Sequence, residues 1–175
     1  MRYARWSVAG SLILLLALPP ALADESQQRR RDASHPATSA ERLQTLARDS
    51  DWEVRQRVAR NRRAPPELLH QLADDSHPQV RIGVATNLDT ADRTFLKLAH
   101  DPEPAVRSVV ARFEYVPARA LAILATDNNG EVRLEVARNW NTAVPTLQRL
   151  SGDPLSGVSQ MAQLSLAKRR EEAGE

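Results

Sequence analysis

Hydrophobic residues recur along this chain at a constant interval, so that each apolar position has a counterpart twenty-six residues further on. Pairs of large apolar residues three positions apart form the first set: Leu43 and Leu46, Leu69 and Leu72, Phe95 and Leu98, Leu121 and Leu124, Leu147 and Leu150. Valines four positions apart, each second valine followed by alanine, form the second: Val54, Val58 and Ala59; Val80, Val84 and Ala85; Val106, Val110 and Ala111; Val132, Val136 and Ala137. A period held without insertion or deletion predicts a repeat protein.

Each unit of the repeat is predicted to form two short helices, because spacings of three and four give each segment one apolar stripe. Helices this short are not stable alone, so neighbouring pairs must stack to bury the stripes. Asn61, Asn87 and Asn139 end the second helix in three units, and we expect them to close it in the left-handed conformation that Asn tolerates. The pattern predicts an all-α solenoid of about five helical pairs over residues 39–167.

Two polar columns accompany the apolar ones at the same interval. The acidic column contains Asp49, Asp75, Asp101, Asp127 and Asp153, and the basic column contains Arg55, Arg81, Arg107 and Arg133, with Ser159 ending it. The aspartates precede the second helix, where a carboxylate can accept hydrogen bonds from free N–H groups. A row of arginines could bind anions. Because the two columns keep the same phase and each Arg follows an apolar Val, we favour a structural role.

The unit "LADDSHPQVRIGVATN" with the proline loop that follows it resembles the leucine-rich repeat variant family and, more broadly, HEAT-type helical repeats. The resemblance implies a right-handed superhelix with a ladder in which Asp49, Asp75, Asp101 and Asp127 pair with Arg55, Arg81, Arg107 and Arg133. Some proteins of that family are associated with a cysteine-bound iron–sulfur cluster. The chain has 0 cysteines, so we predict no cofactor.

The start of the chain differs in character from the repeats. Residues 1–23 combine Arg2 and Arg5, an apolar run and small residues up to Ala23, which predicts a signal peptide cut before Asp24 and a periplasmic or secreted protein. An uncleaved anchor is the alternative, although the apolar run is short for a membrane span. Residues 24–38 lack an apolar period and are predicted to be a flexible polar leader, and residues 168–175 a charged tail.

Charge and composition narrow the function. Removing Arg2 and Arg5 leaves 24 − 2 = 22 basic residues against 22 acidic ones, so the mature chain has no excess charge that would indicate nucleic-acid binding. Without cysteine there is no disulfide framework and no thiolate metal site. The histidines show no metal-ligand spacing, and no catalytic motif is complete, so we predict neither a metal site nor catalytic residues.

Positions on the second helices that vary between units are the candidate binding surface. The resemblance to HEAT-type repeats implies that these helices line the concave side. The candidate partner-binding residues are Arg57, Arg60, Ile82, Val109, Arg112, Leu134 and Arg138. Arginines with apolar residues between them suit a protein or peptide with acidic groups, while an ordinary solvated helix face is the alternative. Trp52 and Trp140 lie outside the repeated columns, as anchors for a partner or as caps on the core.

The sequence therefore predicts an exported, non-enzymatic repeat scaffold that binds a protein or peptide partner on its concave face. Two alternatives stay open. One is a structural envelope protein held at a membrane by the arginines of its leader. The other is an enzyme resembling the pigment lyases that contain HEAT-like repeats.

Overall fold

The structure is a computed structural model that describes residues 20–174, with side chains from residue 24 onward. The predicted signal peptide lies almost wholly outside the described residues. Within residues 20–174 the chain forms helices and no strand. The helices are α1 (Pro20–Ser34), α2 (Ala40–Leu46), α3 (Trp52–Arg60), α4 (Pro66–Leu72), α5 (Pro78–Ala85), α6 (Asp92–Leu98), α7 (Pro104–Arg112), α8 (Ala118–Leu124), α9 (Gly130–Arg138), α10 (Val144–Leu150) and α11 (Ser156–Ala173).

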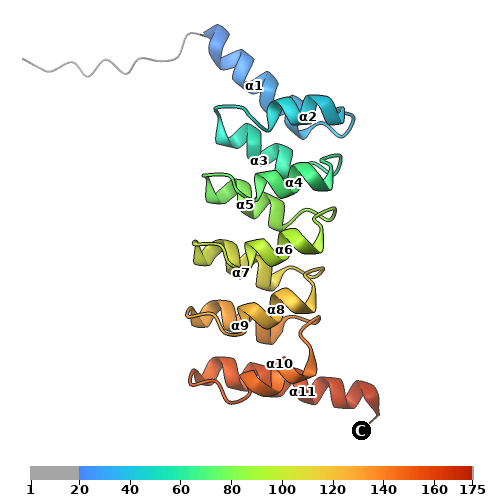
Figure 1. Ribbon diagram of the computed structural model, residues 1–175, viewed down its shortest axis with the longest axis vertical. Coiled ribbons are helices and arrows are strands. Elements are labelled where there is room, and N and C mark those ends of the chain that lie inside the picture. Colours follow the sequence, from blue (N-terminus) through green and yellow to red (C-terminus); the bar gives the residue numbers. More distant parts are fainter. Residues whose placement is uncertain (1–19, 175) are drawn as a thin grey trace, which may run out of the picture.

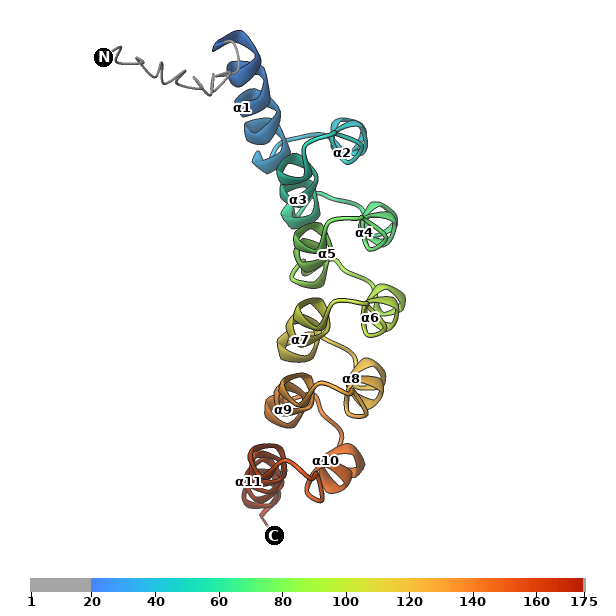
Figure 2. The ribbon, with the colours of Figure 1, turned by 90° about the vertical axis from the view of Figure 1, so that its left-hand side faces the viewer.

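The helices stand in two parallel columns (Figures 1 and 2). One column contains the second helix of each pair, namely α3, α5, α7, α9 and α11, with α1 stacked on its N-terminal end. The other contains the first helices α2, α4, α6, α8 and α10. Both ends of the second-helix column lean toward the same side in Figure 2, so this column lies on the inner side of a shallow curve. The all-helical repeat fold is confirmed; the handedness of the superhelix stays a prediction.

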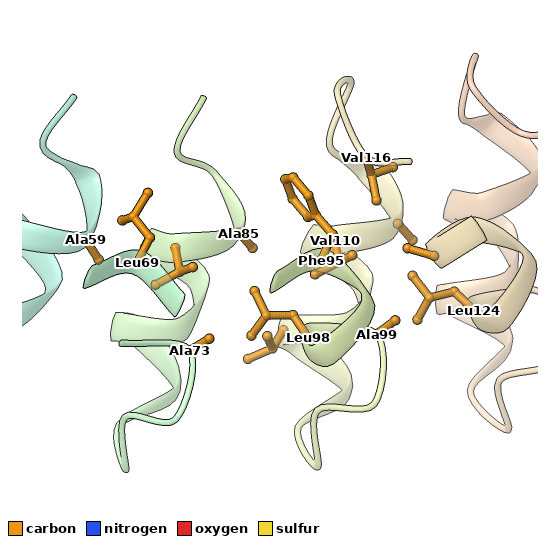
Figure 3. Packing of buried hydrophobic residues seen from close by; sticks show 14 of the residues in the cluster. Ala59, Leu69, Ala73, Ala85, Phe95, Leu98, Ala99, Val110, Val116 and Leu124 are labelled. Carbon is orange, nitrogen blue, oxygen red and sulfur yellow. The ribbon is translucent and has the colours of Figure 1, made fainter. Parts of the chain in front are cut away.

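The repeated apolar columns form one continuous core along the stack (Figure 3). Val54, Val58 and Ala59 are each fully buried, and so are their counterparts in the next three units. The second helices approach one another closely: a Cβ atom added at Gly83 of α5 would lie 3.0 Å from Cβ of Ala59 in α3. Each repeat therefore depends on its neighbours for burial, because two short helices alone enclose no core.

Helix α1 corrects the prediction of a flexible leader at residues 24–38. It occupies the position of a second helix one repeat before α3, and Ala33, twenty-six residues before Ala59, is 0% exposed. Gln28 and Asp32 stand where the next repeat has Val54 and Val58. They are polar because no preceding first helix covers them in the described structure, and their side chains bond to each other at 2.7 Å. Helix α1 is therefore a capping half-repeat, which its polar sequence did not indicate. A solenoid needs such a cap to cover its terminal core.

The C-terminal end is closed by a single long helix. Helix α11 continues to Ala173, so residues 168–173 of the predicted charged tail are its last turns and no break occurs at residue 167. Its side chains bind the preceding repeat: the Ser165 hydroxyl donates to the carbonyl of Ala137 at 2.7 Å, and Arg169 donates to the carbonyls of Trp140 and Thr142. The polar terminal residues therefore stabilise the end of the stack.

Candidate functional site

The arginine and aspartate columns form a largely buried ladder that links consecutive repeats. Each Arg pairs through Nε and Nη2 with the Asp of the following repeat. For Arg55 and Asp75 the two distances are 2.6 and 2.9 Å. The other rungs are Arg81 with Asp101, Arg107 with Asp127, and Arg133 with Asp153. The third guanidinium nitrogen bonds within its own repeat, as in Arg55 Nη1 to the carbonyl oxygen of Asp49 at 2.8 Å.

The aspartates do more than neutralise the arginines. In each of the five, one carboxylate oxygen accepts the N–H of the residue two positions on, as Asp75 does from His77 at 2.9 Å. Burial raises the pKa of the Asp75 and Asp127 carboxyls, but hydrogen bonds from Arg55 and Arg107, the backbone donors and the arginine charges outweigh it, so the net pKa is below the usual value. For Asp153 the hydrogen bond from Arg133 is the largest cause of the lowered pKa.

The ladder begins one helix earlier than the sequence pattern indicated. The Asp49 carboxylate accepts a hydrogen bond from Nε of Arg29 in α1 at 2.8 Å, and Arg29 lies twenty-six residues before Arg55. The neighbouring Arg30 pairs with Asp51 at 2.7 Å and with Glu53 at 2.8 Å. The sequence signal for this rung is that Arg29 lies in register with the basic column. It was overlooked because Arg29 is followed directly by Arg30 and Arg31.

A second ladder runs through the asparagines that end the second helices. The Asn87 amide donates to the carbonyls of Ala59 and Asn61 at 2.7 and 3.0 Å. Asn61 and Asn139 make the equivalent bonds to the repeat before each. No non-glycine residue among those described has a positive φ, so the predicted left-handed closure by Asn is wrong. The chain leaves the helix extended at Asn61 and Asn139, because their side chains bind the preceding repeat instead.

Phe113 replaces the asparagine in the third full repeat. Its ring stacks on Phe95 at a centroid distance of 5.7 Å and meets Tyr115 edge-on at 5.8 Å. Aromatic contacts thus occupy the position where Asn61, Asn87 and Asn139 use an amide.

The exposed side of the second helices holds the candidate partner-binding residues, and we call this surface the inner face. It comprises Arg57 and Arg60 of α3, Ile82 of α5, Val109 and Arg112 of α7, and Leu134 and Arg138 of α9. All four arginines are exposed, and the three apolar residues are half-buried against the core. Arg138 pairs with Glu135 at 3.2 Å, whereas Arg60 and Arg112 form no ion pair with any residue from 24 to 174.

Two adjoining cavities hollow the N-terminal end of the inner face. The larger, about 620 Å³, is lined by Gln27, Arg30, Arg31, Ser34, His35, Pro36 and Arg57. The smaller, about 250 Å³, is lined by Ser34, Gln56, Arg57, Arg60 and Asn61. Sequence reasoning placed Arg57 and Arg60 on this surface but missed the contribution of α1, because it treated residues 24–38 as a leader. Both hollows are open to solvent, and neither lining contains a carboxylate.

Trp52 and Trp140 differ in environment. Trp52 is half-buried and its ring stacks on the His77 imidazole at 4.0 Å, so it packs at the junction of α3 and α5. Trp140 is 62% exposed, with the Arg169 guanidinium 5.9 Å from its ring centroid. Trp140 is therefore the tryptophan that a partner could contact.

Neither a metal-ligand cluster nor a membrane-spanning helix occurs among the described residues. Between residues 24 and 174 there is no group of three or more His, Cys, Asp or Glu side chains that could hold a metal ion. Over the part of the chain that the structure describes, none of the helices has the length and apolar character to cross a membrane.

The stacked helix pairs and their two buried ladders define a helical repeat solenoid. The leucine-rich repeat variant domain model matches residues 27–88 of this chain and so includes most of α1. A solved structure described as a leucine-rich repeat variant with a novel repetitive protein structural motif is similar with a TM-score of 0.61 and 28% identity. That match covers 74% of this chain and 52% of the solved chain, so this chain spans about half the length of that protein. Among curated proteins, none matches this sequence.

The resemblance to the leucine-rich repeat variant family is thereby confirmed. Such domains are repeat scaffolds and are not a known enzyme family.

Proposed function

We propose that this protein is an exported, non-enzymatic repeat scaffold that binds a protein or peptide partner along its inner face. The observation that carries the proposal is a separation of roles among the arginines. Those of the ladder are buried or half-buried and paired with Asp, whereas Arg60 and Arg112 are exposed without an ion pair to any described residue. Exposed arginines flanked by half-buried apolar side chains are the composition that protein-binding surfaces favour.

Export is proposed from the signal-peptide pattern of residues 1–23. Its test is fractionation of expressing cells followed by sequencing of the mature N-terminus, with Asp24 as the expected first residue. A full-length protein retained in the cytoplasm would contradict it.

Binding is tested by affinity capture from envelope extract. The wild-type bait is compared with an inner-face variant that carries Arg60→Glu, Arg112→Glu and Arg138→Glu. A matched control reverses the charge of Arg48, Arg93 and Arg119, which are exposed and lie outside the second helices. A partner retained by the wild-type and the control bait but lost from the inner-face variant supports the proposal. Capture that survives all three inner-face reversals contradicts it.

The membrane-associated alternative receives less support, because it relies on the arginines of the leader. Arg29 is engaged by Asp49, and Arg30 by Asp51 and Glu53, so two of the three are committed within the protein. Headgroup binding would have to compete with those ion pairs.

A further inference from the structure

The inner face is not uniform from end to end. At its N-terminal end α1 and α3 contribute Arg30, Arg31, Arg57 and Arg60. Toward the C-terminus the same columns are mixed in α9, with Leu134 beside Arg138, and they become apolar in α11, with Met161 and Leu164. A partner lying along this face would therefore meet the densest group of arginines at the α1 and α3 end and apolar side chains at α11.

The positive charge at the α1 and α3 end is largely uncompensated. Arg30 is neutralised by Asp51 and Glu53. Arg31, Arg57 and Arg60 form no ion pair with any residue from 24 to 174. Like charges that share one hollow repel, and an anion bound among them relieves that repulsion.

These three arginines contribute little to the fold. Arg31 bonds only to Gln27 of its own helix at 3.4 Å, and Arg57 donates to the Ser34 hydroxyl at 3.1 Å. No hydrogen bond or ion pair is formed by the Arg60 side chain within the described structure. Their position is therefore better explained by a ligand than by packing, in contrast to Arg29, which closes a rung of the ladder.

We infer that the two adjoining cavities form one anion site that receives a carboxylate-rich segment of the peptide partner. The inference rests on the proposed function and specifies the chemistry of the partner. The larger cavity, about 620 Å³, exceeds the space that one carboxylate needs, and its arginines come from two successive repeats. Several acidic side chains spaced along one chain match that arrangement. The half-buried Ile82 and Val109 then lie further along the same face, where apolar residues of the same segment can pack.

The test uses the protein expressed from its full coding sequence and purified in the processed form that accumulates. Fluorescein-labelled hexaglutamate is titrated at low ionic strength and followed by polarisation, and arginine side-chain NMR shifts locate the binding. The pocket variant is Arg57→Gln with Arg60→Gln. The matched control is Arg112→Gln with Arg138→Gln, which removes the same charge from the same face.

The site predicts saturable binding that weakens at least about tenfold in the pocket variant and much less in the control, because charged hydrogen bonds are lost only there. Binding should also weaken as salt is added. Labelled hexaglutamine should not bind. Arg31→Gln alone should weaken binding as well, which provides a second variant if the first is poorly folded.

Three results would overturn the inference. Equal losses in both variant pairs would show general electrostatic attraction to the inner face rather than a site. Pyrophosphate that saturates the same arginines more tightly than hexaglutamate would identify a small anion as the ligand. Binding to anionic lipid vesicles that the pocket variant abolishes, without peptide binding, would identify a lipid surface. Partner capture by the inner face could still succeed in the first case, so the two proposals fail separately.

Discussion

Replacement of Arg81 by alanine tests the ladder at its most buried rung. The side chains of Arg81 and Asp101 are 9% and 2% exposed, the lowest values among the rungs. The guanidinium donates to the Asp101 carboxylate at 2.6 and 2.8 Å and to the carbonyl of Asp75 at 2.7 Å. The substitution removes all of these bonds at once and leaves Asp101 with one remaining donor, the N–H of Glu103 at 2.9 Å.

The expected cost follows from the charge that is left behind. Removing one partner of a buried ion pair typically lowers the free energy of unfolding by about 3–5 kcal/mol, because the remaining charge is desolvated without compensation. An exposed pair contributes about 0–1 kcal/mol. Arg93, which pairs with Glu67 at 3.1 Å with both side chains more than half exposed, provides that comparison within the same chain.

Urea unfolding followed by far-ultraviolet circular dichroism measures both variants. We expect Arg81→Ala to lose several times more stability than Arg93→Ala. The double variant Arg81→Ala with Asp101→Ala should lose less than the sum of the two single variants, because the unpaired carboxylate is then absent. A cost for Arg81→Ala below about 1 kcal/mol, or equal to that for Arg93→Ala, would refute the structural role of the ladder.

Other predictions use the same unfolding assay. Asn87→Ala should lower the free energy of unfolding by about 1–3 kcal/mol, because two buried carbonyls lose their donor, whereas Asn141→Ala, whose side chain is exposed, should cost less. Deleting residues 24–38 from the mature protein should cost about 2–4 kcal/mol through the loss of the α1 cap, and unchanged stability would restore the flexible-leader interpretation. The free energy of unfolding should stay constant above about pH 4 and fall below it. The reason is that Asp75 and Asp127 have lowered pKa values in the folded state, whereas an unfolded Asp has a pKa near about 3.9, so the folded state loses its advantage as these carboxylates are protonated. A pH titration that shows no loss of stability below pH ~4 would contradict this.

The apolar columns were sufficient to predict the fold, because a helix pair with a fixed period has one way to bury its stripe. Val54 and Val58 lie on α3 and Leu69 and Leu72 on α4, as the spacing predicted, and all four are buried. The period also required each unit to stack on the next, which fixed the architecture without any long-range information.

The features that sequence reasoning missed depend on contacts between repeats. Helix α1 carries polar residues where later helices carry valine, so its membership of the array is visible only once Ala33 and Arg29 are placed beside α3. The asparagines were interpreted as local helix ends, since a single unit cannot show that Asn87 reaches the carbonyl of Ala59. The basic cavities were missed for the same reason, because they need α1 and α3 side by side.

Helix α1 contributes both to the stability of the stack and to the proposed anion site. The export proposal therefore bears on that site, because signal cleavage decides how much of α1 remains. Its buried side supplies Arg29 to the first rung and Ala33 to the core, while its open side supplies Arg31 to the cavity. Cleavage before Asp24 keeps every one of these residues in the mature protein. Cleavage one helical turn after Gln28 would remove Arg29 of the first rung together with Arg30 and Arg31 of the larger cavity. The position of the mature N-terminus therefore decides whether the proposed site can exist.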